Sequence, residues 1–422
     1  MMEAEDFEEG SQDFRFEPET VRGWTAAGAY DELFDSLESR TPGLLKRLEE
    51  QKTEARRLFD RLMAAEADQR PALAVSEEFR SLRLADLLLE ESLELQPEEP
   101  LLSEDLAGLA YQVAAQRYEP ALASRVDDAK AHACVLIGAA RRLAGDRPGA
   151  EEAFRRAVVH LTCPPDSLER AFYCQQLAAL RRDQGRDDEA AGLLWRAALV
   201  YNEGSDLLEE GACLAELGFL FVADDQVYRA VLPLTRACEV LDLHRDASLT
   251  VLARLALAVC HARLGEADKA QRVLKTARTM YDRVSDSSRQ LAHVTWMEGK
   301  VAAFTDNLED APGLLETACK AFVRERRLYD AAFAGLDLAA VLAQVGRLES
   351  LQFLIEDVVD GFRPDVGQVG VLRVLGTVES ALLRGRRAEL GDVVASAVKT
   401  LRRYRRNPLL VFEGMTRELH PS

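Results

Sequence analysis

The chain has 422 residues, of which 48% are hydrophobic, and a formal net charge of −19. Residues 1–127 contain 30 acidic and 14 basic residues, a net charge of −16, which leaves −3 for residues 128–422. Because a negative surface repels phosphate groups, nucleic acid and anionic membranes are poor candidates as partners. Ala and Leu are abundant and aromatic residues make up 7%, a composition that favours helices over strands.

Targeting and redox signals point to the cytoplasm. The sequence has no apolar run near the roughly 18 residues that a membrane-spanning helix needs. The acidic start MMEAEDFEEG has neither the basic residues nor the apolar core of a secretory signal. The seven cysteines form no C-x-x-C pair and mostly fall within apolar helical patterns. They are therefore expected to be reduced core residues of a cytoplasmic protein.

Three segments precede the regular part of the chain. Residues 1–20 carry eight acidic side chains with interleaved Phe residues, which predicts an acidic disordered arm. Residues 21–74 are expected to form an N-terminal helical extension, with a long amphipathic helix over 41–65. Residues 75–127 predict a degenerate helix pair, whose first helix is capped by Ser76 and is broken at QPEEP.

A repeated unit begins near residue 128. Turn-forming residues recur about every 40 positions, and apolar residues follow each of them five, nine and twelve positions later. In the first five units the outer two of these residues are Ala and the middle one is large. These three positions share one face of a helix. The turn residues are Gly145, Gly185, Asp225, Gly265, Asp306, Gly346 and Gly385. In the first unit the following residues are Ala150, Phe154 and Ala157.

The helix before each turn carries a second signature. A small residue stands seven positions before the turn in six of the seven units, and a large apolar residue precedes it in most of them. The small residues are Gly138, Ala178, Gly218, Ala258, Gly299 and Ala339. This pattern predicts that the two helices of each unit touch at the small residue.

These features resemble the tetratricopeptide repeat over roughly residues 128–405, although the period is 40 rather than 34 and the early Trp of that family is absent. The resemblance implies an all-α, right-handed α-solenoid of about seven or eight helix pairs over 128–406, followed by a tail at 407–422. It also implies a concave groove lined by the first helices.

The resemblance places candidate partner-binding residues on the first helices. They are His132, Arg142, Phe172, Gln175, Gln176, Arg182, Glu216, Phe219, His293, Trp296, Lys300, Phe304 and Asp337. An alternative for Phe172, Phe219 and Phe333 is that they belong to the core. The fourth unit is nearly all aliphatic at these positions, which predicts either an apolar docking strip or a place where the superhelix closes on itself. Its residues are Leu252, Leu255, Ala256 and Val259.

The resulting functional hypothesis is a non-catalytic scaffold or adaptor that binds a protein or peptide in the groove. The alternative is a signal-sensing regulator that binds a peptide or small ligand and changes conformation. No Gly-rich phosphate loop, zinc-binding helix or nucleophile elbow occurs, so we expect no enzyme activity, no cofactor and no metal.

Paired arginines recur at the ends of two successive first helices, at Arg141 and Arg142 and at Arg181 and Arg182. They suit the negative end of the helix dipole. The alternative is intramolecular docking, in which the acidic N-terminal arm binds these arginines and shields the groove until a partner competes.

Overall fold

The computed structural model describes residues 46–347 except 48, 117, 165–166, 285–287 and 306, together with 374–381 except 379, and 390–406. Every regular element in these ranges is helical, as the composition predicts. The predicted arm at 1–20, the tail at 407–422, and the turn residues Asp306 and Gly385 lie outside the described residues.

The N-terminal part contains a helix over residues 49–64, followed by α2 (Arg70–Ala74), α3 (Leu82–Leu95) and α4 (Pro100–Ala114). The prediction that Ser76 caps the α3 helix was wrong. Ser76 precedes a single 3₁₀ turn that buries Phe79, and the hydroxyl of Ser81 accepts the hydrogen bond from the Leu84 amide. An extended residue with a side-chain acceptor is what an N-cap requires, and Ser81 provides it.

Helix pairs then follow one another along the chain. The first helices of the pairs are α5 (Ala123–Leu143), α7 (Leu168–Asp183), α9 (Leu207–Ala223), α11 (Ala247–Arg263), α13 (Ser288–Phe304) and α15 (Leu328–Gln344). The second helices are α6 (Arg147–His160), α8 (Asp187–Glu203), α10 (Val227–Val240), α12 (Ala267–Val284) and α14 (Ala311–Arg324). Further along the chain, α18 (Leu390–Arg406) contacts α15.

The predicted turn residues have the backbone conformation that the repeat requires. Gly145, Gly185, Gly265 and Gly346 have φ values of 87°, 73°, 77° and 74°, and Asp225 has 66°. At Gly145 the amides of residues 145 and 146 donate to the carbonyls of Arg142 and Arg141. This is the hydrogen-bond pattern of a left-handed helix end, which explains why Gly, or Asp in one unit, occupies the site.

The small residues pack as the pattern predicts. Gly138 lies against the ring of Phe154 in the same helix pair, so that a Cβ at 138 would be 3.0 Å from the ring. The alanines that flank the large residue, Ala150 and Ala157 in the first pair, are fully buried there and in each of the next four pairs. A small residue opposite a large one lets the two helices approach closely.

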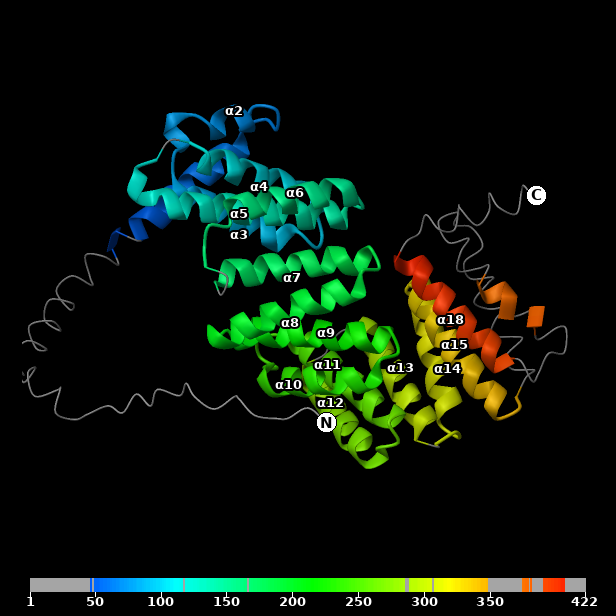
Figure 1. The fold of residues 1–422 in the computed structure, drawn as a ribbon. Helices are drawn as coiled ribbons and strands as arrows, with labels where there is room; N and C mark the ends of the chain where they lie inside the picture. Colours follow the sequence, from blue (N-terminus) through cyan, green and yellow to red (C-terminus); the bar gives the residue numbers. More distant parts are fainter. Residues whose placement is uncertain are drawn as a thin grey trace, which may run out of the picture.

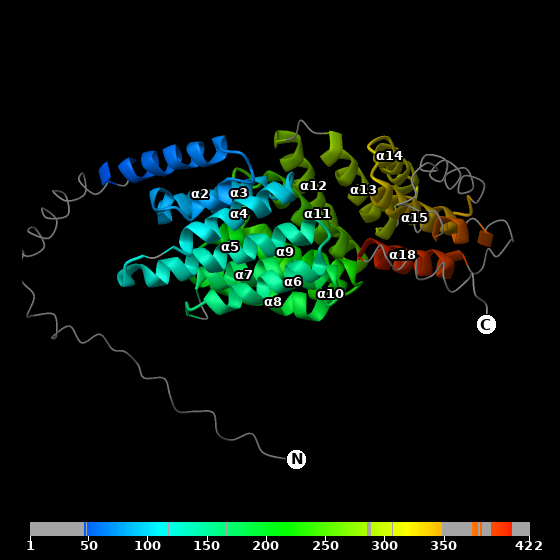
Figure 2. The ribbon, with the colours of Figure 1, turned by 90° about the horizontal axis from the view of Figure 1, so that it is seen from above.

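The stack of pairs is curved. In Figure 1 the pairs from α5 to α12 stack along one direction, and the stack then turns so that α15 and α18 lie to the side. Neighbouring first helices such as α9 and α11 contact one another, whereas the second helices α8 and α10 leave a groove between them. The first helices therefore line the inner side of the curve, and the view from above gives the same order of elements (Figure 2).

The seven cysteines are all free thiols, and five of them are buried. Burial raises the pKa of the Cys238 and Cys260 thiols to about 11. These thiols therefore behave as small core side chains rather than as nucleophiles. Among the described helices, none combines the length and the apolar character needed to cross a bilayer.

Candidate functional site

The inner surface is the side of the stack formed by the first helices α5, α7, α9, α11, α13 and α15. Its side chains make contacts from one first helix to the next. The rings of His132 on α5 and Phe172 on α7 meet edge to face, with centroids 4.8 Å apart. Burial lowers the pKa of His132, so its imidazole is neutral at pH 7. Phe172 also packs against the core, as the alternative for this residue proposed.

Two ion pairs continue this surface from α5 to α9. Arg142 donates to the Asp183 carboxylate at 2.9 Å, and Arg182 lies 3.7 Å from the Glu216 carboxylate. Removal from water raises the pKa of Glu216, while the charges of Arg182 and Arg142 oppose that shift. The result is a row of alternating charges that are partly desolvated.

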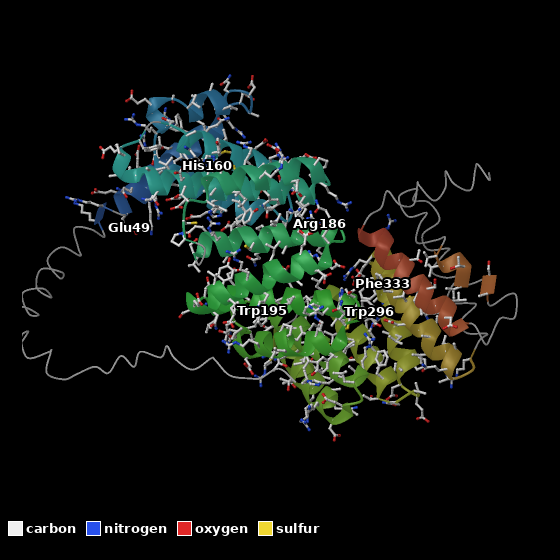
Figure 3. All side chains as sticks on the ribbon, in the orientation of Figure 1. Glu49, His160, Arg186, Trp195, Trp296 and Phe333 are labelled. Carbon is white, nitrogen blue, oxygen red and sulfur yellow. The ribbon has the colours of Figure 1, made fainter. Side chains whose placement is uncertain are left out.

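A denser cluster lies between α13 and α15. One Asp337 carboxylate oxygen accepts hydrogen bonds from Trp296 Nε1 and Lys300 Nζ, both at 2.9 Å. Trp296 is buried, with its ring near those of His293 and Phe322. Figure 3 shows Trp296 and Phe333 on the two facing helices. The sequence pattern placed Trp296, Lys300 and Asp337 on the same surface, and the structure brings them into direct contact.

The remaining candidates are distributed along the inner surface. The Gln175 amide Nε2 donates a hydrogen bond to the Glu209 carboxylate at 3.1 Å. Phe304 is exposed, and its ring lies beneath the guanidinium of Arg263. Phe219 packs against the core, and Gln176 is half-buried. The sequence analysis missed mainly the carboxylates Asp183 and Glu209. Asp183 lies 41 residues after Arg142 and Glu209 lies 34 residues after Gln175, and this spacing of about one repeat could have indicated them.

Two of the four aliphatic residues of the fourth unit are closed off from solvent. Leu255 and Val259 on α11 are buried in the core, where α11 contacts α9, α12 and α13. Leu252 and Ala256 are half-buried, so a closed contact within the stack holds for Leu255 and Val259 alone. Close packing of first helices on the inner side of a curve removes these side chains from solvent.

The paired arginines are all engaged within the solenoid. Arg141 binds Glu104 at 2.7 Å, and Arg181 binds both oxygens of Glu151. Arg142 and Arg182 pair with carboxylates of neighbouring first helices, as described above. A separate acidic segment would have to compete with these pairs, because each guanidinium already has a partner.

The inner surface carries polar and aromatic side chains along its length. Within the described ranges, no group of His, Cys, Asp and Glu side chains could hold a metal ion. The side chains instead offer ring edges, amides and charges of both signs in a row. Such a surface can hydrogen-bond an extended chain and accommodate its side chains between helices.

Comparisons with known proteins support the fold. No protein-family model matches the sequence, and no curated protein matches it either. Among solved structures, a Rap protein complexed with competence and sporulation factor is 14% identical, with a TM-score of 0.52, and the match covers 79% of this chain and 97% of that one. The apo form of the quorum sensor NprR from B. thuringiensis is also 14% identical with a TM-score of 0.52, and the match covers 77% and 97%.

At this level of identity the likeness concerns the fold, and it extends over nearly the whole length of both solved chains. It agrees with the 40-residue period, the left-handed turns and the small-to-large packing of each pair. The chain therefore has the fold of an all-α solenoid built from tetratricopeptide-like helix pairs.

Proposed function

We propose that this protein is a non-catalytic adaptor that binds a peptide, or an extended segment of a protein, on its inner surface. The observation that carries the proposal is the polar and aromatic contacts between neighbouring first helices. They join α5, α7 and α9, from His132 and Phe172 onward, and again join α11, α13 and α15, as far as Trp296 and Asp337. A row of this kind presents a partner with many weak contacts of fixed spacing, which suits an extended chain.

A second candidate is a regulator that changes conformation when a peptide binds. It is favoured by the match to two chains whose names describe a complex with competence and sporulation factor and a quorum sensor. The inner-surface contacts also favour it, because each of them joins neighbouring helix pairs. A ligand that replaced the Arg182 contact to Glu216, for example, would change how α7 and α9 sit together.

The test is selection of binders from a random peptide library on the full chain, followed by affinity measurements on variants. Phe304→Ala on the inner surface is compared with Val158→Ala on the outer helix α6, because the two side chains are similarly exposed, at 47% and 50%. We expect Phe304→Ala to weaken binding at least about fivefold and Val158→Ala to leave it unchanged. Equal losses, or no selected binder at all, would contradict the proposal.

The two candidates differ in solution scattering. A regulator changes its radius of gyration when the selected peptide saturates it, whereas an adaptor keeps the same curve. The measurement uses the same peptide and the full chain, so it separates the candidates without further variants.

A further inference from the structure

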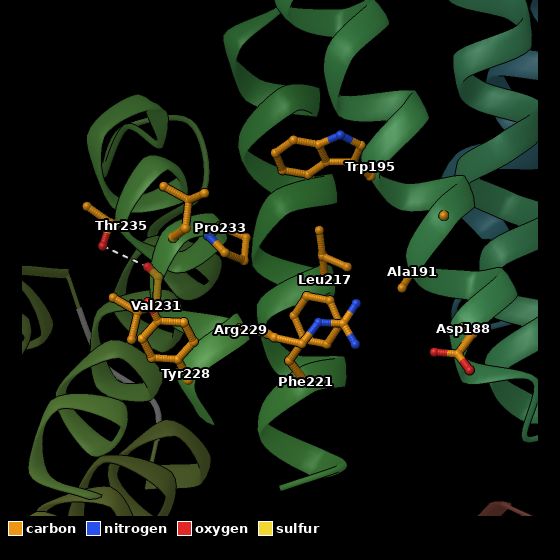
Figure 4. A pocket seen from close by; sticks show the side chains of 12 residues that line it. Asp188, Ala191, Trp195, Leu217, Phe221, Tyr228, Arg229, Val231, Pro233 and Thr235 are labelled. Carbon is orange, nitrogen blue, oxygen red and sulfur yellow. Dashed lines mark hydrogen bonds between the residues drawn. The ribbon is translucent and has the colours of Figure 1, made fainter. Parts of the chain in front are cut away.

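A groove on the second helices lies on the opposite face from the proposed peptide site. It runs between the second helices α8 and α10, with α9 as its floor, and has a volume of about 740 Å³. Leu217 and Phe221 of α9 line the floor, and Trp195 and Tyr228 stand at the two sides (Figure 4). A second cavity of about 490 Å³ continues the groove toward the C-terminal ends of the two helices and shares Trp195, Leu232 and Pro233 with it.

The rim of this groove is unusually apolar for a solvent-facing surface. Tyr228 and Leu232 of α10 have exposed fractions of 84% and 69%, and Trp195 of α8 has 43%. Leu199 extends the strip along α8. An exposed cluster of large apolar side chains beside an apolar groove is typical of a protein interface.

The charges at the ends of the groove narrow the choice of partner. The end nearest the start of both helices carries Asp188 and Arg229, and the other end carries Glu210, Arg236 and Glu239, with Arg236 bound to Glu210 at 2.8 Å. The groove therefore has more acidic than basic side chains. An acidic segment such as residues 1–20 would meet Asp188 at one end and Glu239 at the other, which disfavours it as the occupant.

We propose that this groove is a self-association surface that joins two copies of the chain about a two-fold axis. The surface offers both a ridge, formed by Tyr228 and Leu232, and a groove beside it, so it can be complementary to itself. Both simple two-fold arrangements pair unlike charges at Arg229. An axis along the groove places it opposite Asp188 of the second copy, and an axis across the groove places it opposite Glu239 of the second copy.

The interaction leaves the inner surface of each copy open, because α8 and α10 belong to the outer side of the stack. A dimer formed in this way would present two peptide sites that face away from each other. The two proposals rest on different residues and can fail independently.

The test is the concentration dependence of the particle mass of the full chain, measured by analytical ultracentrifugation. We expect the weight-average mass to rise toward that of two chains as the concentration increases through about 10–100 µM. Leu232→Lys is expected to weaken self-association at least about tenfold. Val159→Lys on α6 is the matched control, because Val159 has an exposed fraction of 74% and lies outside the groove.

Tyr228→Glu provides a second variant that does not touch the core, and circular dichroism verifies that each variant is folded. A chain that stays monomeric up to about 200 µM would overturn the proposal. A dimer that persists in both Leu232→Lys and Tyr228→Glu would also overturn it, since another surface, or the segments at either end of the chain, would then form the contact.

Discussion

Gly299 of α13 lies directly against Leu315 of α14, so closely that a Cβ at position 299 would be 2.8 Å from both Cγ and Cδ2 of the leucine. The two residues stand seven positions before and nine positions after the same turn residue, Asp306. The same relationship joins Gly138 to Phe154 in the first pair. The spacing of the repeat is therefore a packing rule within each helix pair.

This relationship predicts that Gly299→Ala destabilises the protein. The added methyl group has no room unless the Leu315 side chain or the two helices shift, and overpacking of this kind costs about 1–3 kcal/mol. Gly313→Ala in α14 is the control, because nothing lies within 4 Å of a Cβ there. It should be neutral or stabilising by up to about 1 kcal/mol, since Ala favours helices over Gly. Urea unfolding measures both, and equal effects would contradict the packing rule.

The left-handed turns give a second prediction. Gly185 has a φ of 73° with open space around it, so that only the backbone conformation opposes a side chain. Gly185→Ala is expected to lower the free energy of unfolding by about 1–2 kcal/mol. The comparison with Gly313→Ala isolates the effect of φ, because both sites have room for a methyl group. A stabilising effect of Gly185→Ala in urea unfolding would show that the turn can relax to another conformation.

The ion pair between the buried Arg181 and the half-buried Glu151 predicts a specific pH dependence. Hydrogen bonds from Arg181, aided by Gln184, lower the pKa of Glu151 to about 2. Because the folded pKa lies below the unfolded value near 4.5, the carboxylate stabilises the fold fully above about pH 4.5. This stabilisation is lost as the pH falls toward about 2.

Glu151→Gln should therefore cost about 1–3 kcal/mol at pH 7, and the difference from the parent chain should shrink between pH 4.5 and 2.5. Glu189→Gln is the control, because Glu189 also faces Arg181 but is half-exposed, and its loss should cost under about 1 kcal/mol. Unfolding curves at several pH values measure these differences. A difference for Glu151→Gln that is independent of pH would rule out this ion pair as the source.

The contact of Asp337 with Trp296 and Lys300 predicts the effect of removing its carboxylate. Asp337→Ala leaves the indole N–H of Trp296 buried without its acceptor, which costs about 1–3 kcal/mol. Because the surroundings of the indole change, its near-ultraviolet circular dichroism should change as well. Asp268→Ala on the exposed face of α12 is the control, in which the free energy of unfolding and the near-ultraviolet spectrum should stay unchanged.

Much of the architecture could be predicted from local patterns. The turn residues, the small residue on the first helix and the small-large-small series on the second helix all depend on contacts within about 25 residues of chain. Such contacts recur with similar residues in most units, so their periodicity is visible in one sequence. The exception is the cap of α3, which is Ser81 rather than Ser76. It lies before the regular units, where a 3₁₀ turn that buries Phe79 separates Ser76 from the helix.

The amino-acid sequence by itself determined the helix pairs, their turns and the face that each pair buries, because these are set by side-chain size and backbone conformation at short range. Only the tertiary structure decided which inner-surface side chains meet, such as Arg142 with Asp183. It also decided that Leu255 is buried and that α8 and α10 leave a groove between them. These features depend on the angle between successive helix pairs. Many small packing contacts set that angle together, so no single residue spacing in the sequence predicts it.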